Sequence, residues 1–335
     1  MGGPPVKIGD LGELGLIATL RDYVRLVKGS RLGFDEDASD LPVCDSQSIV
    51  INVDTFVAKT DLLPDMTWAQ AGRKTAVMAM SDLVAKGTRP QVSLVSLCAP
   101  EDFETKDATE IIRGFSQYCL KNDVYFLGGD LGMSDDVILT AVALGVVDSN
   151  HIVTRGGAHV GDIIAVTGLF GLTSVAYQVL LKGLAAPESL RKRAVAEAYL
   201  PHIDFNLIPS LAKSGLVSSC MDSSDGLGKT LNTMAQQSSN LFHINRLPLA
   251  SGVREFGRTH DLDELNLVMR GGEEFVCVAT IPTEKWDAAE RIAREVGGRL
   301  IPIGHVMSGS GVRYESSEGL VDVPLEGYDS YKEWG

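Results

Sequence analysis

Acidic residues beside glycine or serine recur along the chain, each time where an apolar run ends. A strand that ends in aspartate brings a carboxylate to the edge of a sheet, and an adjacent glycine lets a phosphate approach the backbone closely. Magnesium prefers octahedral oxygen ligands, which it usually shares with phosphates and water. The pattern therefore indicates a cation and phosphate site. The six clusters are Phe34-Asp-Glu-Asp37, Asn52-Val-Asp54, Ser81-Asp82, Gly128-Gly-Asp130, Met221-Asp-Ser-Ser-Asp-Gly226 and Gly271-Gly-Glu-Glu274.

Three of these acids are stronger candidates than the others. Taken singly, an acid at the end of a strand is also explained by a turn or a helix cap. Asp82 is different because it lies inside the apolar helical segment 76–84, where an unpaired carboxylate is costly. Asp222 and Asp225 lie three residues apart where a strand passes into a helix, and two such close carboxylates are favoured around a cation.

Several other classes of site find no support in the sequence. The formal net charge of −14 argues against a nucleic-acid partner, because such binders have basic surfaces. The five cysteines form no Cys-x-x-Cys pair and the six histidines no His-Glu-x-x-His pair, so a zinc ribbon or a redox dithiol is not expected. Gly228-Lys229-Thr230 resembles the end of a Walker A loop, but Ser223 stands where that motif needs its first glycine.

The elements that must position the acids are of mixed type. Several predicted strands follow one another without a helix between them, which favours an α+β fold over a doubly wound sheet. The chain of 335 residues suits two domains, and the glycine-rich stretch 151–161 suits their boundary. The patterns predict helices over 10–29, 67–85, 105–122, 172–182, 187–199, 227–237 and 284–296, and strands over 48–53, 91–98, 124–127, 136–147, 162–167, 273–281 and 299–306.

The hydropathy pattern contains neither a membrane span nor a signal peptide. No apolar run approaches the roughly 20 residues that span a bilayer, and the N-terminus has no apolar signal-peptide core. We therefore expect a cytoplasmic protein without a membrane partner.

In this order, the acidic clusters resemble those of the thiamine-monophosphate kinase family, in the group that includes aminoimidazole ribonucleotide synthetase and selenophosphate synthetase. The motifs run from about residue 12 to residue 331, nearly the whole chain. The Ser-Asp-Gly-Leu and Gly-Gly-Glu blocks are specific in combination. The matching stretches are 33–38, 54–58 with 63–65, 80–87, 128–130, 154–158 with 161–162, 222–227, 271–275 and 327–331.

The resemblance implies a fold and a reaction. It implies two α+β domains, which we place at residues 1–150 and 151–335, and a homodimer in which the N-terminal sheets pair into a barrel-like interface. The implied reaction moves the γ-phosphoryl group of ATP directly onto thiamine monophosphate with the help of Mg²⁺. Catalysis would then consist of alignment and charge neutralisation, with no covalent phosphoenzyme.

The resemblance also implies residue roles. Asp222 and Asp225 would be catalytic. Asp61, Glu273 and Tyr331 would face the substrate. Gly129, Asp130, Arg155 and Ser224 would contact ATP. Magnesium would be held by Glu36 or Asp37, Asp54, Asp82, Asp130, Asp222 and Asp225.

Some positions depart from the family pattern. Asp61 stands where the family has a histidine that faces the substrate, Val53 replaces a threonine, Leu131 follows the Gly-Gly-Asp block in place of the common threonine, and Glu36-Asp37 replaces an Asp-Asp pair. Two alternatives therefore stay open. One is a paralogous ATP-dependent enzyme of the same group with another small substrate, and the other is a non-catalytic nucleotide-binding protein.

Overall fold

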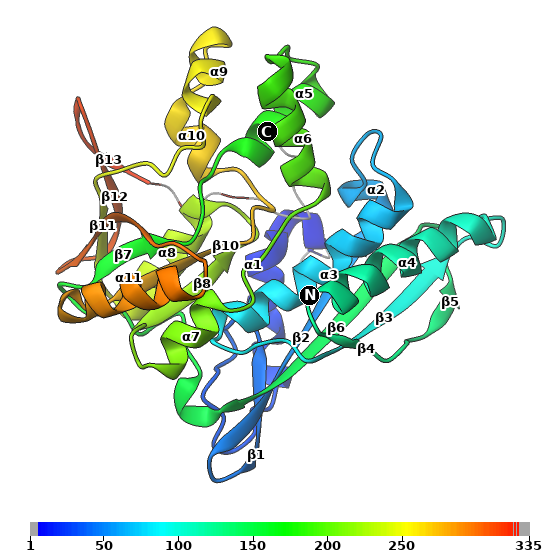
Figure 1. Ribbon diagram of the computed structural model, residues 1–335, viewed down its shortest axis with the longest axis horizontal. Coiled ribbons are helices and arrows are strands. Elements are labelled where there is room, and N and C mark those ends of the chain that lie inside the picture. Colours follow the sequence, from blue (N-terminus) through cyan, green and yellow to red (C-terminus); the bar gives the residue numbers. More distant parts are fainter. Residues whose placement is uncertain (1–5, 324, 326, 328–335) are drawn as a thin grey trace, which may run out of the picture.

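A computed structural model places two β-sheets and the helices that cover them (Figure 1). The structure describes residues 6–323 together with residues 325 and 327. The N-terminal sheet has the order β1-β2-β6-β3-β4, with β5 also paired to β3, and the C-terminal sheet has the order β13-β12-β9-β11-β7-β10-β8. The strands are β1 (Ser39–Cys44), β2 (Gln47–Val57), β3 (Val92–Ala99), β4 (Tyr125–Phe126), β5 (Leu131–Met133), β6 (Ile138–Asp148), β7 (Ile163–Val166), β8 (Ser219–Ser223), β9 (Leu241–Ile244), β10 (Val276–Ile281), β11 (Ile301–Met307), β12 (Gly311–Ser316) and β13 (Gly319–Asp322).

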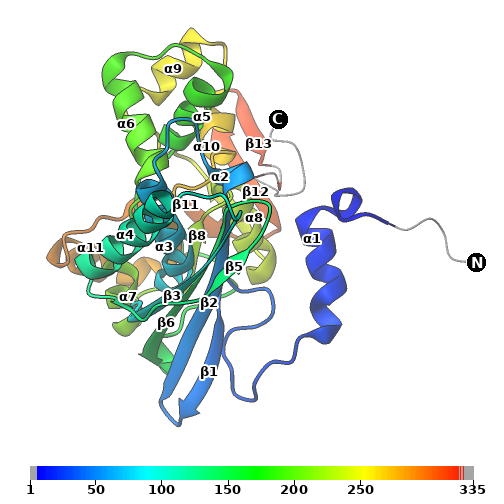
Figure 2. The same cartoon turned by 90° about the vertical axis from the view of Figure 1, so that its right-hand side faces the viewer.

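The helices lie between and around these sheets (Figures 1 and 2). They are α1 (Ile8–Leu20), α2 (Ala58–Asp61), α3 (Trp68–Ala85), α4 (Thr105–Lys121), α5 (Leu172–Lys182), α6 (Glu188–Tyr199), α7 (Leu207–Lys213), α8 (Leu227–Ser238), α9 (Val253–Thr259), α10 (Glu264–Met269) and α11 (Trp286–Glu295). Within the described residues, short 3-10 turns occur at Arg21–Tyr23, Ser149–His151 and Thr283–Lys285. No helix of the described residues combines the length and the apolar character needed to cross a membrane.

The N-terminal sheet has one covered face and one open face. Alternation along β2 turns the even-numbered residues from Ser48 to Phe56 toward the face that α3 covers, Asn52 and Asp54 among them, and turns odd-numbered residues such as Val53 outward. β6 alternates in the same way against β2 in an unbroken antiparallel register from Val57–Ile138 to Gln47–Asp148. In Figure 2, α3 and α4 lie on one side of these strands and α1 on the other.

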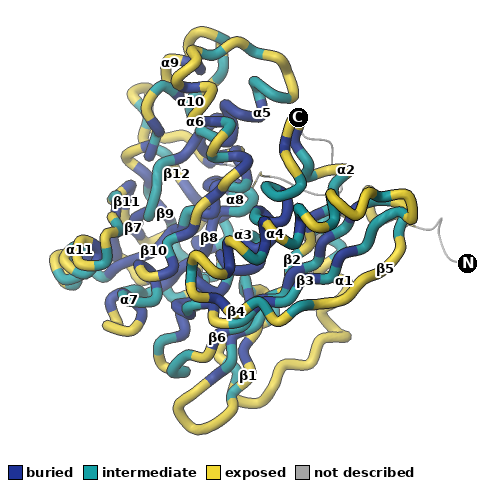
Figure 3. The backbone as a smooth tube through the Cα atoms, turned by 45° about the vertical axis from the view of Figure 1, so that its right-hand side comes forward, coloured by how far each residue is buried: buried dark blue, intermediate teal, exposed yellow. Residues whose placement is uncertain are grey.

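Helix α3 joins the two sheets. Thr67 caps its first turn by accepting a hydrogen bond from the Gln70 backbone N–H, and the Gln70 side chain accepts one from the Thr67 N–H in return. Small residues on all sides of α3 let it pack against β2 and β6 on one side and against β8 on the other. One buried core therefore runs from the N-terminal sheet through α3 into the C-terminal half (Figure 3).

The α+β prediction is confirmed, with two boundaries corrected. The predicted first helix, 10–29, ends at Leu20 and is followed by a 3-10 turn and extended chain. The predicted strand 273–281 begins only at Val276, because residues 271–275 form a loop in which Glu273 and Phe275 adopt positive φ. Tyr331 lies outside the described residues.

Candidate active site

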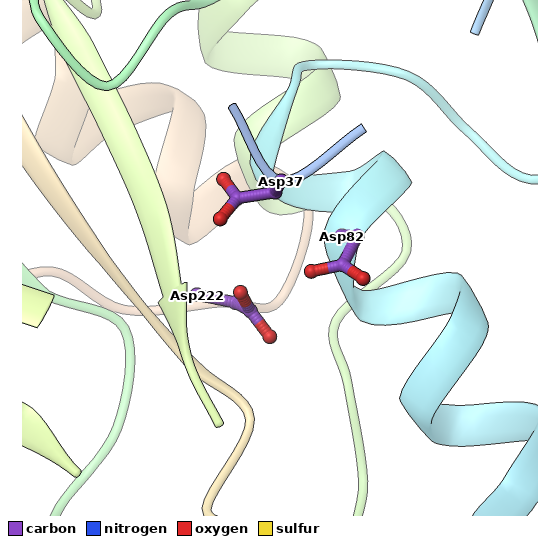
Figure 4. Close-up of side chains that lie close together, drawn as sticks. All are labelled: Asp37, Asp82 and Asp222. Atoms are coloured by element: carbon purple, nitrogen blue, oxygen red, sulfur yellow. The ribbon is translucent and has the colours of Figure 1, made fainter. Parts of the chain in front are cut away.

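Three aspartates from distant parts of the chain meet between the two sheets. Asp37 precedes β1, Asp82 lies in the last turns of α3, and Asp222 lies on β8. Their carboxylates point toward one another, with one oxygen of each within 4.8 Å of the others (Figure 4). We call this set the aspartate trio. Oxygen donors from three elements at this spacing fit the ligand preference of a divalent cation.

Fixed hydrogen bonds hold two members of the trio in place. The Ser81 hydroxyl donates to Asp222 Oδ2 at 2.8 Å, and the Asn52 amide donates to Asp82 Oδ2. The other oxygen of Asp222, Oδ1, is buried and has no hydrogen-bond partner among the described residues. An unpaired buried carboxylate oxygen costs free energy unless a ligand satisfies it, and a cation bound by the trio would satisfy Asp222 Oδ1.

Two basic residues hold Asp37 and its neighbour Glu36. Arg155 Nε donates to Asp37 Oδ1 at 2.7 Å, and its backbone N–H donates to the Glu36 carboxylate at 3.0 Å. Lys86 Nζ donates to Glu36 Oε2 at 2.8 Å and forms an ion pair with Asp37 Oδ2 at 2.6 Å. Arg155, which the resemblance assigns to ATP, therefore binds Asp37 through its guanidinium group in this structure.

The three carboxylates of the trio have different charged neighbours, and their pKa values differ accordingly. Burial alone would raise the pKa of Asp37, but Lys86 and Arg155 outweigh burial and hold it below its usual value. Burial, followed by the charges of Asp222, Asp37 and Asp54, raises the pKa of Asp82 well above its usual value. Burial and then Asp37 raise the pKa of Asp222 to about 6. Asp82 and Asp222 thus lack the cation that Asp37 already has.

Asp54 and Asp225 lie beside the trio. Burial raises the pKa of Asp54 to about 7 against the hydrogen bond it accepts from the Thr55 N–H, and the charges of Asp222, Asp225 and Asp61 raise it further. Asp54 is therefore close to both the trio and Asp61. Asp225 pairs with Lys229 one helical turn on, with 2.7 Å between Oδ2 and Nζ.

A second pocket lies next to Asp61. Its lining combines two carboxylates, Asp61 and Glu273, with the Tyr177 ring and the apolar side chains of Leu63 and Leu181. Burial raises the pKa of Asp61, although its carboxylate accepts a hydrogen bond of 2.7 Å from the Val57 N–H. A pocket with apolar walls and acidic groups suits an aromatic cation.

Glu273 is held from three sides. Lys74 of α3 is fully buried, and its Nζ lies 2.6 Å from Glu273 Oε1, while the Tyr177 hydroxyl donates to Oε2. The Glu273 backbone N–H donates to the Ser224 carbonyl at 2.6 Å. The loop that carries Glu273 is thereby fastened to the end of β8 and the turn after it, which carry Asp222 and Asp225, so the pocket and the trio belong to one site.

Gly226 allows this contact between loops. Its φ is +104°, and a Cβ placed there would lie 2.8 Å from the carbonyl oxygens of Met269 and Gly271. Both the backbone conformation and the close approach therefore require glycine.

Gly129 and Asp130 lie at a different edge. They run beside β3, where Val95 N–H donates to the Gly128 carbonyl and Leu97 N–H to that of Asp130. A Cβ on Gly129 would lie 1.7 Å from the Val95 carbonyl oxygen. The strand order places β6 and β3 between them and Asp54, which amounts to about 14 Å at the usual spacing of strands. The trio and Asp130 are thus separate within one chain.

The Gly129–Asp130 edge borders its own hollow. Ala108, Ile112 and Ser116 of α4 line it on one side, and Phe126 and Leu131 line it on the other. The lining is mostly apolar, which suits a flat ring more than a phosphate.

Sequence reasoning identified the acids but missed three neighbours. Lys74, Lys86 and Tyr177 were not predicted, although the two lysines carried a usable signal. Lys74 lies just before and Lys86 just after the apolar segment 76–84 that contains Asp82, so the same argument about buried charge applies to them. Nothing in the sequence marks Tyr177, because its role depends on how α5 packs beside the 271–275 loop.

Proteins of similar sequence carry a common family name. Residues 35–147 match the family model described as AIR synthase related protein, N-terminal domain. A thiamine-monophosphate kinase of Nitrosopumilus maritimus is 33% identical over 282 residues, which cover 84% of this chain and 87% of the relative. One from Pyrococcus horikoshii is 28% identical over 315 residues, covering 93% and 95%.

Solved structures of other proteins have a similar fold. The protein tt0281 from Thermus thermophilus superposes with a TM-score of 0.83 at 29% identity, covering 92% of this chain and 97% of that one. The structure described as AaThiL complexed with AMPPCP and TMP has a TM-score of 0.84 at 22% identity, covering 97% and 99%, and shows the shared fold. The chain therefore belongs to the thiamine-monophosphate kinase family.

Proposed function

We propose that this protein transfers the γ-phosphoryl group of ATP to thiamine monophosphate and so forms thiamine diphosphate. The observation that carries the proposal is that the Glu273 pocket and the trio lie side by side in one site. The acidic, apolar-walled pocket of Asp61, Glu273 and Tyr177 suits the cationic aromatic end of thiamine, and the trio beside it suits the Mg²⁺ that would bind the phosphates. Relatives that cover most of this chain are named thiamine-monophosphate kinase, and AaThiL is described with AMPPCP and TMP together.

The residues present fit Mg²⁺. Asp37, Asp82 and Asp222 would hold it, with Asp54 and Asp225 at the margin, because Asp222 Oδ1 is buried without a partner among the described residues and the pKa values of Asp54, Asp82 and Asp222 are raised by burial and mutual repulsion. When bound, Mg²⁺ would neutralise phosphate charge and align the donor and acceptor phosphates.

The chain's own groups would position the reactants. Glu273, fixed by Lys74 and Tyr177, would orient the thiamine end, and the Ser224 backbone would keep that carboxylate in register with Asp222. No serine, cysteine or histidine nucleophile was predicted, and direct transfer between two bound phosphates requires none. Alignment and charge neutralisation then account for catalysis.

We propose that ATP binds against the predicted contacts Gly129, Asp130, Arg155 and Ser224. The apolar hollow beside Gly129 and Asp130 supports an adenine position there. Because this edge is about 14 Å from Asp54 by strand spacing, it binds a part of ATP remote from the trio or serves the trio of a second copy.

We further propose a homodimer formed through the open face of the N-terminal sheet. The outward residues of β2 and β6 are largely aliphatic, and Val53 at the centre of this face is 60% exposed. An apolar sheet face of this kind marks an interaction surface. In this proposal, residues 1–150 dimerise and carry much of the trio, whereas residues 151–335 contribute Asp222, Asp225 and Glu273. Five free cysteines suit the reducing cytoplasm.

Phosphorus NMR of the reaction mixture tests this function. With ATP, Mg²⁺ and thiamine monophosphate, we expect ADP and thiamine diphosphate in equal amounts. A panel of other small phosphates and carboxylates, incubated in parallel, tests the paralogue alternative. Turnover with another acceptor but not with thiamine monophosphate would favour that alternative, and ATP binding without any turnover would favour the non-catalytic one.

A further inference from the structure

Lys86 is an unusual residue in the floor of the site. It caps the C-terminus of α3, and its side chain is fully buried. Its ammonium group donates to Glu36 Oε2 at 2.8 Å and to the Cys220 carbonyl at 3.0 Å, and it pairs with Asp37 Oδ2 at 2.6 Å. Three oxygen atoms from three residues thus surround one fixed positive charge, which matches the three N–H groups of an ammonium.

The oxygens around Lys86 are the kind that a divalent cation would otherwise bind. Glu36 and Asp37 are the pair that resemblance assigned to metal, but both are already neutralised by protein groups. Lys86 pairs with one oxygen of Asp37 and Arg155 donates to the other. The Glu36 carboxylate accepts hydrogen bonds from Lys86 and from the Arg155 backbone N–H. Asp82 and Asp222, a few ångströms away, have no basic partner of this kind among the described residues.

The charge balance of the cluster points the same way. Glu36, Asp37, Asp82 and Asp222 carry four negative charges when ionised, and Lys86 and Arg155 carry two positive charges. The remaining two negative charges lie on the Asp82–Asp222 side, with Asp54 next to them, and a divalent ion would balance them there. A second divalent ion at Glu36–Asp37 would meet the Lys86 ammonium at contact distance, where like charges repel strongly.

We propose that Lys86 is a built-in cation that occupies a position at Glu36–Asp37 and thereby confines divalent metal to the Asp82–Asp222 side of the trio. The inference rests on the proposed Mg²⁺-dependent function. In this arrangement Glu36 is not a metal ligand. It positions Lys86, and Lys86 in turn fixes the Asp37 carboxylate that borders the metal.

Counting bound Mn²⁺ by electron paramagnetic resonance tests this on the full-length protein without nucleotide. Lys86→Met removes the charge but keeps a similar length, so we expect it to bind one more Mn²⁺ per chain than the wild type. Lys285→Met is the control, because Lys285 likewise donates to a backbone carbonyl, that of Gly215 at 2.7 Å, but belongs to neither the trio nor the Glu273 pocket, and its count should equal that of the wild type. An equal count in folded Lys86→Met and wild-type protein would overturn the proposal.

A second comparison does not depend on how well Lys86→Met folds. Glu36→Gln should leave Mn²⁺ affinity within about twofold of the wild type, whereas Asp82→Asn should weaken it by at least about tenfold. A tenfold loss in Glu36→Gln would make Glu36 a metal ligand and contradict the inference. Both experiments measure metal binding and not turnover. A protein that gives the expected metal binding but fails to phosphorylate thiamine monophosphate would therefore refute only the proposed function.

Discussion

At the scale of single residues, the site is built on buried carboxylates that repel one another, and the proposed cation would relieve that repulsion. Asp82 and Asp222 have raised pKa values because they are buried and close to other acids, whereas Asp37 has a lowered pKa because Lys86 and Arg155 face it. The presence of acids at these positions was predictable, since each cluster ends an apolar run. Their pairing with basic residues was not, because Arg155 and Lys86 reach Asp37 from distant segments.

Replacement of Asp222 by asparagine separates catalysis from folding. We expect Asp222→Asn to lower kcat by at least about 100-fold, because it removes charge that balances phosphate repulsion. The metal-free melting temperature should stay equal or rise, because the change relieves repulsion with Asp37 and Asp82. Steady-state kinetics and thermal denaturation check both. An unchanged kcat at saturating Mg²⁺ would remove Asp222 from the metal site.

The raised pKa values predict how pH affects the metal-free protein. The pKa values of Asp54 and Asp222 are about 7 and about 6 in the folded chain, above their values in the unfolded chain. Between the unfolded pKa values and these folded ones, the folded state therefore binds more protons than the unfolded state. The stabilising contribution of these groups is thus present at low pH and is lost as the pH rises through about 6 to 7.

Magnesium should reverse that trend, because it binds the deprotonated carboxylates and displaces protons. We expect the increase in melting temperature on adding Mg²⁺ to be larger at about pH 8 than at about pH 6. Asp222→Asn should reduce the difference. An Mg²⁺ effect independent of pH would show that these carboxylates do not take up the ion.

At the scale of elements, helix α3, strands β2 and β8 and the loops beside them build the site. Helix α3 was predictable from its cap at Thr67 and its apolar run, and the strand that carries Asp54 was predictable from its β-branched residues. The loop 271–275 was mistaken for the start of a strand, because Glu273 and Phe275 take positive φ only where the Ser223 and Ser224 carbonyls hold their N–H groups. Such a long-range contact leaves no local pattern.

Gly226→Ala tests the contact between these loops. A Cβ there would meet two carbonyl oxygens at 2.8 Å in a backbone conformation that disfavours alanine, so we expect a loss of about 1–3 kcal/mol in the free energy of unfolding. The KM for thiamine monophosphate should also rise, because the Glu273 loop must shift. Gly183→Ala is the control, with φ of +71° but open space around its Cβ. Its cost should be smaller and its KM unchanged, and equal effects of the two changes would contradict the loop contact.

At the scale of the whole molecule, the two sheets share a core through α3, and the N-terminal sheet keeps an open face. The α+β class and the division of the acids between two halves were predictable from element order. The strand order was not, because β6 inserts between β2 and β3 although it follows both in the chain. That order creates the aliphatic open face and moves Asp130 away from the trio.

A charge on the open face tests the homodimer. Val53→Lys should convert a dimer into a monomer in light scattering at micromolar concentration, because an unpaired lysine at the centre of an apolar interface is costly to bury. Leu320→Lys on β13 is matched in exposure, 59% against 60%, and should leave the dimer intact. A wild-type monomer, or dissociation by Leu320→Lys alone, would place the interface elsewhere or remove it.

The central claim is that the trio and the Glu273 pocket together transfer phosphate from ATP to thiamine monophosphate. A single-turnover reaction with ATP labelled at the γ-phosphate tests it most directly. The account predicts that the label passes into thiamine diphosphate at a rate that Asp222→Asn lowers by about 100-fold, and that none becomes attached to the protein. Label found on the protein, only in inorganic phosphate, or in thiamine diphosphate at the same rate in Asp222→Asn would contradict it.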